Sequence, residues 1–209
     1  MEVCMAQAES AQSETAGERK VYVVYGVVPR GAPCVVFDID GVLVDCSVRL
    51  RRSLEEVGAS DTSELLGEKR RRFWEVFLSE KYMDADVANP EAVELAWKRR
   101  LSGYRVVLVT GRPERLSAAT FEQLRRFNVV FDAVVFRAND YRGKDHEYKR
   151  TVLEELGLRV AELHDDSEQV CAACAHLADS VYLWRNLRPV PWKPVVQPAE
   201  DRLERTLSA

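Results

Sequence analysis

The sequence predicts an α/β fold, in which a parallel sheet carries helices on both faces. The first observation is that short apolar runs alternate with amphipathic helical segments from about residue 33, a pattern typical of βαβ units. The second is that two of these runs end in paired acids, Asp38 with Asp40 and Asp165 with Asp166. The carboxyl ends of parallel strands meet at one edge of a sheet, where ligands bind.

The core helices have recognisable start and stop signals. Asn89 is a favourable N-cap, Pro90 suits the first helical position, and Gly103 ends the segment. Apolar residues recur at helical spacing between these signals. Three further helices are expected on the same grounds: one opened by Arg112-Pro113 and capped at Asn128, one from Asp145 to Leu156, and one capped by Ser167.

Short runs rich in Val, Leu and Phe separate these helices and predict buried strands. They cover residues 34–37, 105–110, 133–136, 159–164 and 181–184. The alternation occupies residues 21–45 and 87–186, which we expect to form the core.

Residues 46–86 interrupt the alternation and predict a small helical cap, inserted after the first core strand. The first of its two amphipathic helices is expected to end at Gly58. The second is expected to be capped near Asp61, because Glu64 follows three residues later. Such a cap would lie over the paired acids.

The two ends of the chain differ from the core. Residues 1–20 are small, polar and charged, and predict a flexible tail. Residues 21–28 are β-prone and predict an added edge strand. Residues 187–209 predict a proline-containing extension with a short helix from about Asp201.

The composition indicates one soluble domain of 209 residues, with 46% hydrophobic residues and a net charge of −4. No apolar run is long enough to span a bilayer, and the first residues lack the features of a signal peptide. The five cysteines are an odd number without a disulfide-framework spacing, which favours a cytoplasmic location. The oligomeric state stays open.

Cys171 and Cys174 form a CxxC pair, which could indicate a redox or zinc site. They lie within an amphipathic helix, and no second CxxC completes a zinc site. We therefore interpret them as small residues of the core.

The paired acids predict a metal site. Side chains alternate along a strand, so Asp38 and Asp40 point the same way, and Gly41 allows the chain to turn immediately afterwards. Asp165 and Asp166 would join them at the same edge of the sheet. Crowded carboxylates repel one another unless a cation compensates, and carboxylate oxygens suit Mg²⁺.

Four motifs together resemble those of the haloacid dehalogenase superfamily, whose members are mostly phosphohydrolases. They are Asp38-Ile39-Asp40-Gly41-Val42-Leu43, Thr110-Gly111-Arg112, Lys149 and Asp165-Asp166. The resemblance covers roughly residues 33–185. It implies a Rossmann-like core and Mg²⁺-dependent transfer of a phosphoryl group to an aspartate.

The resemblance also implies a role for each motif residue. Asp38 would be the nucleophile and Asp40 the general acid and base. Thr110 and the backbone N–H groups of Gly111 and Arg112 would hold the phosphoryl oxygens. Lys149 would neutralise charge, although Lys144 is a rival for this role.

The metal ligands would be Asp38, Asp165 and the backbone carbonyl of Asp40. Asp166 would ligate directly or through water, or would merely cap the helix that follows.

Two segments, residues 136–149 and 165–170, are similar to the phosphatase domains of polynucleotide kinase-phosphatases. This resemblance implies a substrate with a nucleic acid 3′-phosphate end, bound in part by Arg137 and Arg142. A GxxxxGK[ST] kinase motif is absent from the sequence.

Two alternatives remain, a phosphatase of nucleotides or sugar phosphates and a noncatalytic nucleic-acid-binding member of the fold. Basic runs at Arg49-Arg51-Arg52, Lys69–Arg72 and Lys98–Arg100 could steer a polyanion or be solvated helix faces.

Overall fold

The computed structural model describes residues 21–28 and 31–192. The predicted tail over residues 1–20 and the predicted helix from Asp201 lie outside the described residues. No helix within the described ranges is both long and apolar enough to cross a membrane.

A seven-stranded sheet forms the centre of the described chain, in the order β1-β6-β5-β2-β7-β8-β9. The five inner strands are parallel, as predicted, whereas the edge strands β1 and β9 pair antiparallel with their neighbours. The strands are β1 (Tyr22–Gly26), β2 (Pro33–Phe37), β5 (Arg105–Pro113), β6 (Ala133–Arg137), β7 (Arg159–Asp165), β8 (Ala178–Arg185) and β9 (Arg188–Pro191).

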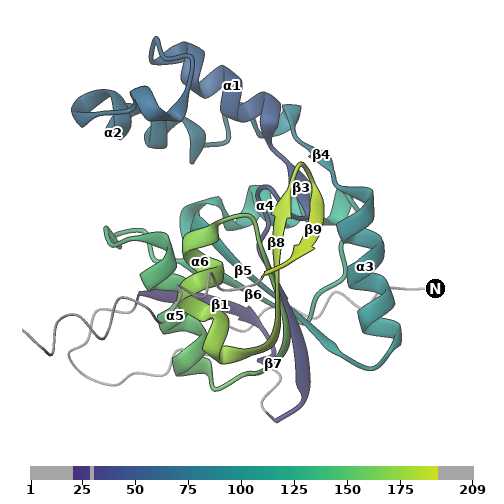
Figure 1. Cartoon of the computed structure of the whole chain (residues 1–209). Helices are drawn as coiled ribbons and strands as arrows, with labels where there is room; N and C mark the ends of the chain where they lie inside the picture. Colours follow the sequence, from purple (N-terminus) through teal and green to yellow (C-terminus); the bar gives the residue numbers. More distant parts are fainter. Residues whose placement is uncertain (1–20, 29–30, 193–209) are drawn as a thin grey trace, which may run out of the picture.

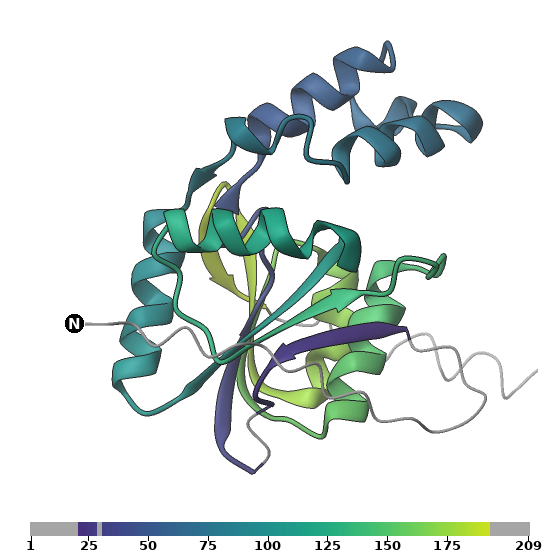
Figure 2. The same ribbon diagram turned by 180° about the vertical axis from the view of Figure 1, so that it is seen from behind.

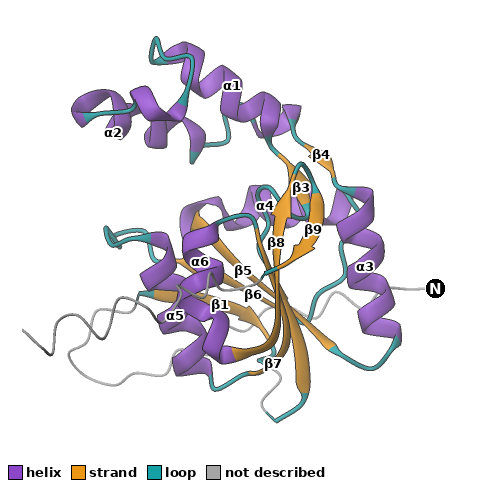
Figure 3. Cartoon of the chain, in the orientation of Figure 1, coloured by secondary structure: helices purple, strands orange, loops and turns teal. Residues whose placement is uncertain are grey.

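Alternating side chains of the strands bury the two faces of the sheet. In β2, Cys34 and Val36 pack under α5 (Asp145–Leu156) and α6 (Glu168–Cys174). Their neighbours Val35 and Phe37 belong to the opposite layer, which is covered by α3 (Pro90–Leu101) and α4 (Ser117–Arg126). Figure 3 shows the sheet between its helices, and Figure 2 shows α4 lying across the second face. Helices on both faces are the expected α/β architecture.

The CxxC pair lies in the first of these layers. Cys171 and Cys174 are fully buried in α6 and contribute to the core. Their interpretation as small core residues is confirmed.

A helical cap lies above the carboxyl edge of the sheet (Figure 1). Its helices are α1 (Ser47–Glu56) and α2 (Gly67–Phe77). The chain enters and leaves the cap through a two-stranded connector, β3 (Val44–Asp45) and β4 (Val87–Ala88). The cap has a small apolar core of its own, formed by Leu54, Ala59, Leu65, Phe73 and Phe77.

The predicted start of the second cap helix is wrong. Asp61 accepts a hydrogen bond from the backbone N–H of Ser63 and caps a short 3₁₀ turn, η1 (Thr62–Glu64). The carboxylate of Glu64 accepts hydrogen bonds from the backbone N–H and the hydroxyl of Ser60, which precedes this turn. These local contacts close the turn, and the helix begins only at Gly67.

The helix after the second core strand also begins later than predicted. Pro113 has an extended backbone and pairs with Arg137, so β5 continues through Arg112-Pro113. A 3₁₀ turn, η3 (Glu114–Leu116), then leads into α4 at Ser117. Two further 3₁₀ turns are η2 (Met83–Ala85), which precedes β4, and η4 (Ala175–Leu177), which follows α6.

Asn89 precedes α3 as predicted, but its side chain does not cap that helix. Its Nδ2 donates to the carbonyls of Val42 at 2.7 Å and Leu187 at 3.1 Å. Leu187 lies in the turn between β8 and β9 and has a positive φ of 63°. The end of the cap connector is thus tied to the loop after β2 and to this hairpin.

Candidate active site

The carboxyl edge of the sheet gathers the predicted acids around one buried lysine. The Nζ of Lys149, on α5, lies 2.7 Å from Asp165 Oδ2, 3.0 Å from Asp38 Oδ2 and 3.4 Å from Asp145 Oδ2. Burial alone would lower the pKa of Lys149, but the carboxylates of Asp145, Asp165 and Asp38 hold it well above its ordinary value. Lys149 is therefore a fixed positive charge beside Asp38. The rival Lys144 is exposed and pairs with Glu147.

Asp38, Asp165 and Asp166 form the candidate metal cluster. Each offers a carboxylate oxygen, and these oxygens lie within 4.8 Å of one another. Burial, followed by neighbouring carboxylates, raises the pKa of Asp38 and of Asp165 despite Lys149. Asp166 is the exposed member of the cluster, and partial removal from water, followed by the charge of Asp38, raises its pKa. When these carboxylates are ionised, their negative charges lack sufficient positive charge nearby. Their oxygen atoms therefore fit a hard divalent cation such as Mg²⁺.

Two glycines allow carboxylates to approach the backbone at this site. Gly41 has a φ of +79°, and an added Cβ would lie 2.3 Å from Asp166 Oδ2. At Gly111 an added Cβ would lie 2.6 Å from Asp145 Oδ1. A side chain at either position would therefore require the neighbouring carboxylate to shift.

Asp40 is bound by two buried arginines. Arg112 Nε lies 2.8 Å from Asp40 Oδ2, and Arg112 Nη2 lies 2.6 Å from Oδ1. Arg49, from cap helix α1, also donates to Oδ1. Burial alone would raise the pKa of Asp40, but the guanidinium groups of Arg112 and Arg49 hold it well below its usual range. The carboxylate of Asp40 therefore faces the arginines.

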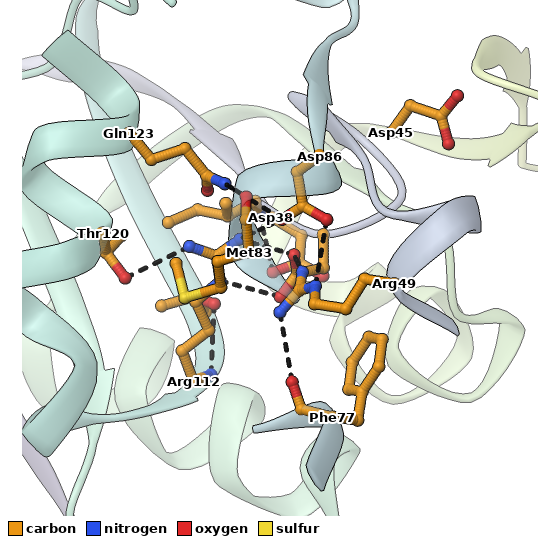
Figure 4. Close-up of polar contacts among 12 residues, drawn as sticks. Asp38, Asp45, Arg49, Phe77, Met83, Asp86, Arg112, Thr120 and Gln123 are labelled. Atoms are coloured by element: carbon orange, nitrogen blue, oxygen red, sulfur yellow. Dashed lines mark hydrogen bonds and ion pairs between the residues drawn. The ribbon is translucent and has the colours of Figure 1, made fainter. Parts of the chain in front are cut away.

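Arg49 is the centre of a polar network that joins cap and core (Figure 4). Its Nε donates to Asp86 Oδ1 at 3.1 Å, and its Nη1 donates to the carbonyl of Phe77 at 3.3 Å. Asp86 also accepts from Gln123 Nε2 of α4 at 2.9 Å. Arg112 Nη1 reaches Thr120 Oγ1 of the same helix at 3.1 Å. The network ties α1 to the sheet and to α4.

Sequence reasoning missed Arg49 and Asp86 as site residues. Arg49 stood in a basic run that could have been a solvated face, yet its side chain is fully buried. No sequence signal marked Arg49, because only the structure shows that Ser53, four residues later on the same face of α1, is buried with it. Asp86 had no signal of its own, because its contacts come from segments far apart in the chain.

The predicted phosphate-binding residues occupy different surroundings. Thr110 is buried, and its Oγ1 accepts from the backbone N–H of Arg112 at 3.2 Å. A hydroxyl that accepts one hydrogen bond can still donate one. The side chain of Arg112 is engaged by Asp40. Arg137 is half-buried at the end of β6, and Arg142 is exposed in the loop before α5.

Most of the basic runs are neutralised within the chain. Lys98 pairs with Glu94, Arg99 with Glu162, and Arg100 with Asp132. On α2, Arg71 pairs with both Glu68 and Glu75. Arg70 and Arg72 are exposed and form no ion pair within residues 21–28 and 31–192. Only part of the predicted basic surface is thus available to a polyanion.

Neither protein-family models nor curated proteins provide a match to the sequence. Among solved structures, a chain of the Pnkp1/Rnl/Hen1 RNA repair complex is 24% identical, with a TM-score of 0.52 over 70% of this chain and 40% of that one. The Protein Tyrosine Kinase A of Mycobacterium tuberculosis is 18% identical, with a TM-score of 0.53 over 76% of this chain and 87% of that one. A haloacid dehalogenase-like hydrolase from Bacteroides fragilis is 16% identical, with a TM-score of 0.49 over 68% of this chain and 83% of that one.

The first two of these similarities show the fold. The chain has the Rossmann-like core that the resemblance to haloacid dehalogenase phosphatases predicts, with a mostly parallel sheet between helices. It spans about two fifths of the length of the matched chain from the RNA repair complex.

Proposed function

We propose that this chain is a Mg²⁺-dependent phosphomonoester hydrolase that works through an aspartyl-phosphate. The observation that carries the proposal is the position of Asp38 at the end of the central strand. There it lies 3.0 Å from the Lys149 Nζ and shares a carboxylate cluster with Asp165 and Asp166. A nucleophile, a fixed positive charge and metal-binding oxygens are the groups that phosphoryl transfer requires.

In the first step, an oxygen of Asp38 attacks phosphorus and the alkoxide departs. The Thr110 hydroxyl and the N–H group of Gly111 hold the phosphoryl oxygens, while Lys149 offsets their charge and the N–H group of Arg112 stays bonded to Thr110 Oγ1. Bound Mg²⁺, held by Asp38, Asp165, Asp166 and the Asp40 carbonyl, would neutralise phosphoryl charge and keep Asp38 ionised. In the second step, water hydrolyses the aspartyl-phosphate.

Asp40 is the proposed acid and base. In the described geometry it is ionised, because Arg112 and Arg49 hold its pKa low. An ionised carboxylate suits the second step, in which it removes a proton from water. To protonate the leaving alkoxide in the first step, Asp40 must first gain a proton, and withdrawal of Arg49 with the cap would favour this.

The proposed substrate is a nucleic acid 3′-phosphate end. The similarity of residues 136–149 to polynucleotide phosphatase domains supports it, and so does a shared fold with a chain of an RNA repair complex. A phosphatase of small molecules is the second candidate, favoured by the net charge of −4 and by the internal pairing of the basic residues Lys98, Arg99 and Arg100.

Hydrolysis of p-nitrophenyl phosphate with and without Mg²⁺ tests the proposal. We expect Asp38→Asn to reduce Mg²⁺-dependent turnover by several orders of magnitude with an unchanged circular dichroism spectrum, because the nucleophile and a charged ligand are both lost. Asp84→Asn, at an exposed position in the cap, is the matched control. Substantial turnover by Asp38→Asn would refute the covalent mechanism.

A substrate panel then separates the candidates. It compares 3′-phosphorylated oligonucleotides with mononucleotides and sugar phosphates. Preference for the sugar phosphates would overturn the nucleic acid assignment and leave the phosphatase assignment intact.

A further inference from the structure

Three arginines lie together at the carboxyl edge of β6, outside the carboxylate cluster. Arg137 ends β6 beside its β5 neighbour Pro113, and Arg115 follows in η3. The backbone N–H of Arg115 donates to Asn139 Oδ1 at 2.8 Å, which ties η3 to the loop that carries Arg142. Burial lowers the pKa of Arg137, and the positive charges of Arg115 and Arg142 lower it further. We call these three residues the arginine cluster.

No member of the arginine cluster forms an ion pair within the described residues, although the charge of Asp145 acts on Arg137. The Nε of Arg137 is buried and has no hydrogen-bond partner there. Arg142 Nη1 reaches only the backbone carbonyls of Asn139, at 2.9 Å, and Tyr141, at 3.3 Å. Arg115 Nη2 donates to the carbonyl of Leu78 in the cap at 3.0 Å.

Gathered like charges and a buried unpaired donor are both unfavourable unless an anion compensates them. The contrast with the other buried and half-buried arginines supports this reading. Arg99, Arg100 and Arg112 each meet a carboxylate. The arginine cluster therefore has the properties of an anion site.

Asp145 connects the arginine cluster to the reaction centre. Its Oδ2 lies 3.4 Å from the Lys149 Nζ, which is 3.0 Å from Asp38. Its Oδ1 approaches Gly111 so closely that a Cβ there would lie 2.6 Å away. Asp145 is also the carboxylate that most opposes the lowering of the Arg137 pKa. The arginine cluster thus lies one side chain beyond the place proposed for the reacting phosphoryl group.

We propose that the arginine cluster binds a second phosphate group of the substrate, next to the one that is hydrolysed. Guanidinium groups bind phosphate through paired hydrogen bonds, and a phosphate would supply both the missing charge and the acceptor for Arg137. This inference rests on the proposed phosphatase function. The second phosphate can be the phosphodiester of a strand or the other monoester of a nucleoside bisphosphate.

Three substrates test the proposal: thymidine 3′-phosphate, thymidine 3′,5′-bisphosphate, and a dithymidylate that ends in a 3′-phosphate. The last two carry the second phosphate at the same position, as a monoester and as a diester. We expect kcat/KM for at least one of them to exceed that for thymidine 3′-phosphate by about 10-fold to 100-fold, mainly through KM. The faster of the two identifies the source. Equal values for all three overturn the proposal.

Substitutions of single arginines test whether the arginine cluster causes the preference for a second phosphate. Arg142→Gln and Arg137→Gln should each reduce kcat/KM for the preferred two-phosphate substrate about 10-fold more than for thymidine 3′-phosphate. Arg125→Gln is the control, because Arg125 is exposed on α4 and pairs with Glu122. Arg142 is exposed, so its variant tests the proposal even if Arg137→Gln does not fold. An unchanged ratio of the two kcat/KM values in Arg142→Gln overturns it.

The outcome is distinguishable from failure of the proposed function. Mg²⁺-dependent hydrolysis of p-nitrophenyl phosphate without any preference for a second phosphate rejects the arginine cluster alone. If the protein hydrolyses none of the substrates, the proposed function fails. In that case, the affinity for a fluorescent oligothymidylate 3′-phosphate tests the arginine cluster separately. Equal affinities of wild type and Arg142→Gln overturn the inference.

Discussion

Asp40 shows how single side chains are held at this site. Two buried guanidinium groups, Arg112 from β5 and Arg49 from the cap, surround its carboxylate. Asp86 supplies the second negative charge, so the buried group contains two cations and two anions. A change to one member leaves the others with uncompensated charge, and the side chains of Arg49, Arg112 and Asp86 are fully buried.

Replacing Asp40 should affect substrates unequally. Asp40→Asn removes the proposed proton donor, so hydrolysis of an alkyl phosphate should fall far more than that of p-nitrophenyl phosphate, whose leaving group needs little protonation. Labelled phosphoenzyme should accumulate as its hydrolysis slows. Steady-state kinetics on both substrates provide the measurement, and equal losses would argue against an acid and base role.

The same variant should unfold more easily. We expect Asp40→Asn to lower the free energy of unfolding by about 3–5 kcal/mol at pH 7, because Arg49 and Arg112 lose a buried partner. The folded-state pKa of Asp40 is depressed. The stability that Asp40 contributes is therefore present above its unfolded-state pKa of about 4 and is lost as pH falls below that value. Urea unfolding should therefore show a constant difference from wild type between pH 5 and 8. That difference should shrink in stronger acid.

Gly41 provides a test of close packing. Gly41→Ala places a Cβ 2.3 Å from Asp166 Oδ2 in a left-handed backbone conformation. Gly58→Ala is the matched control, because its φ is +67° but nothing lies within 4 Å of the added Cβ. The control should lose about 1–2 kcal/mol of stability. Gly41→Ala should lose more and should also bind Mg²⁺ more weakly in calorimetry. Equal behaviour of the two variants would contradict a tight contact at Asp166.

At the scale of elements, α2 presents chemically different flanks. Phe73 and Phe77 are buried in the cap, whereas Arg71 is neutralised by Glu68 and Glu75 on the opposite side. Arg70 and Arg72 lie between these two faces. Neither pairs with a carboxylate of the described residues, so each can meet a polyanion on its own side of the helix.

Neutralising Arg70 and Arg72 distinguishes a polynucleotide substrate from a small one. If both meet phosphates, Arg70→Gln with Arg72→Gln should reduce the slope of log K against log salt by about 1.4 for a single-stranded 3′-phosphorylated oligonucleotide. Arg71→Gln should leave the slope unchanged, because its charge is already paired. Fluorescence anisotropy at several salt concentrations measures the slopes. An unchanged slope in the double variant would identify a solvated helix face.

At the scale of the molecule, periodicity predicted the core. Alternating apolar runs fixed the five parallel strands, and signals such as Gly157, which closes α5 in a left-handed conformation, fixed several helix ends. The acids at strand ends were also predictable, because topology alone brings them together. The clustering of Asp38, Asp165 and Asp166 agrees with that reasoning.

Long-range polar contacts could not be predicted in this way. Arg49 reaches Asp40, Asp86 and the carbonyl of Phe77, which lies 28 residues away. No local pattern encodes such partners. Local competition also displaced the start of α2, where Asp61 and Glu64 stabilise a turn in place of a helix.

We expect the carboxylate cluster to make the stability of the fold depend on Mg²⁺ and pH. The pKa values of Asp38, Asp165 and Asp166 are raised in the fold. Their contribution to the free energy of unfolding is therefore most favourable below their unfolded-state pKa of about 4. It declines as pH rises through their folded-state pKa values. Without Mg²⁺, the fold should lose stability on this account between pH 5 and 8.

Added Mg²⁺ should reverse this loss, and its affinity should rise with pH because binding releases protons. At a free concentration 100 times the Kd, it should stabilise the fold by about 2.7 kcal/mol. Thermal unfolding at pH 6 and pH 8 with Mg²⁺ or EDTA provides the measurement. A larger Mg²⁺ effect at pH 6 than at pH 8 would contradict this description.

The connector β3–β4 would allow the cap to be exchanged for another segment. Asp45 and Val87 are direct antiparallel partners, so a two-residue turn could join them without altering any strand of the main sheet. Segments of other length and sequence could be grafted at the same place, which offers a route by which related chains diversify. Such an exchange would remove Arg49 and Asp86 together. Of the two guanidinium groups at Asp40, only Arg112 would then remain. Each new cap would have to supply its own groups to set the pKa of Asp40.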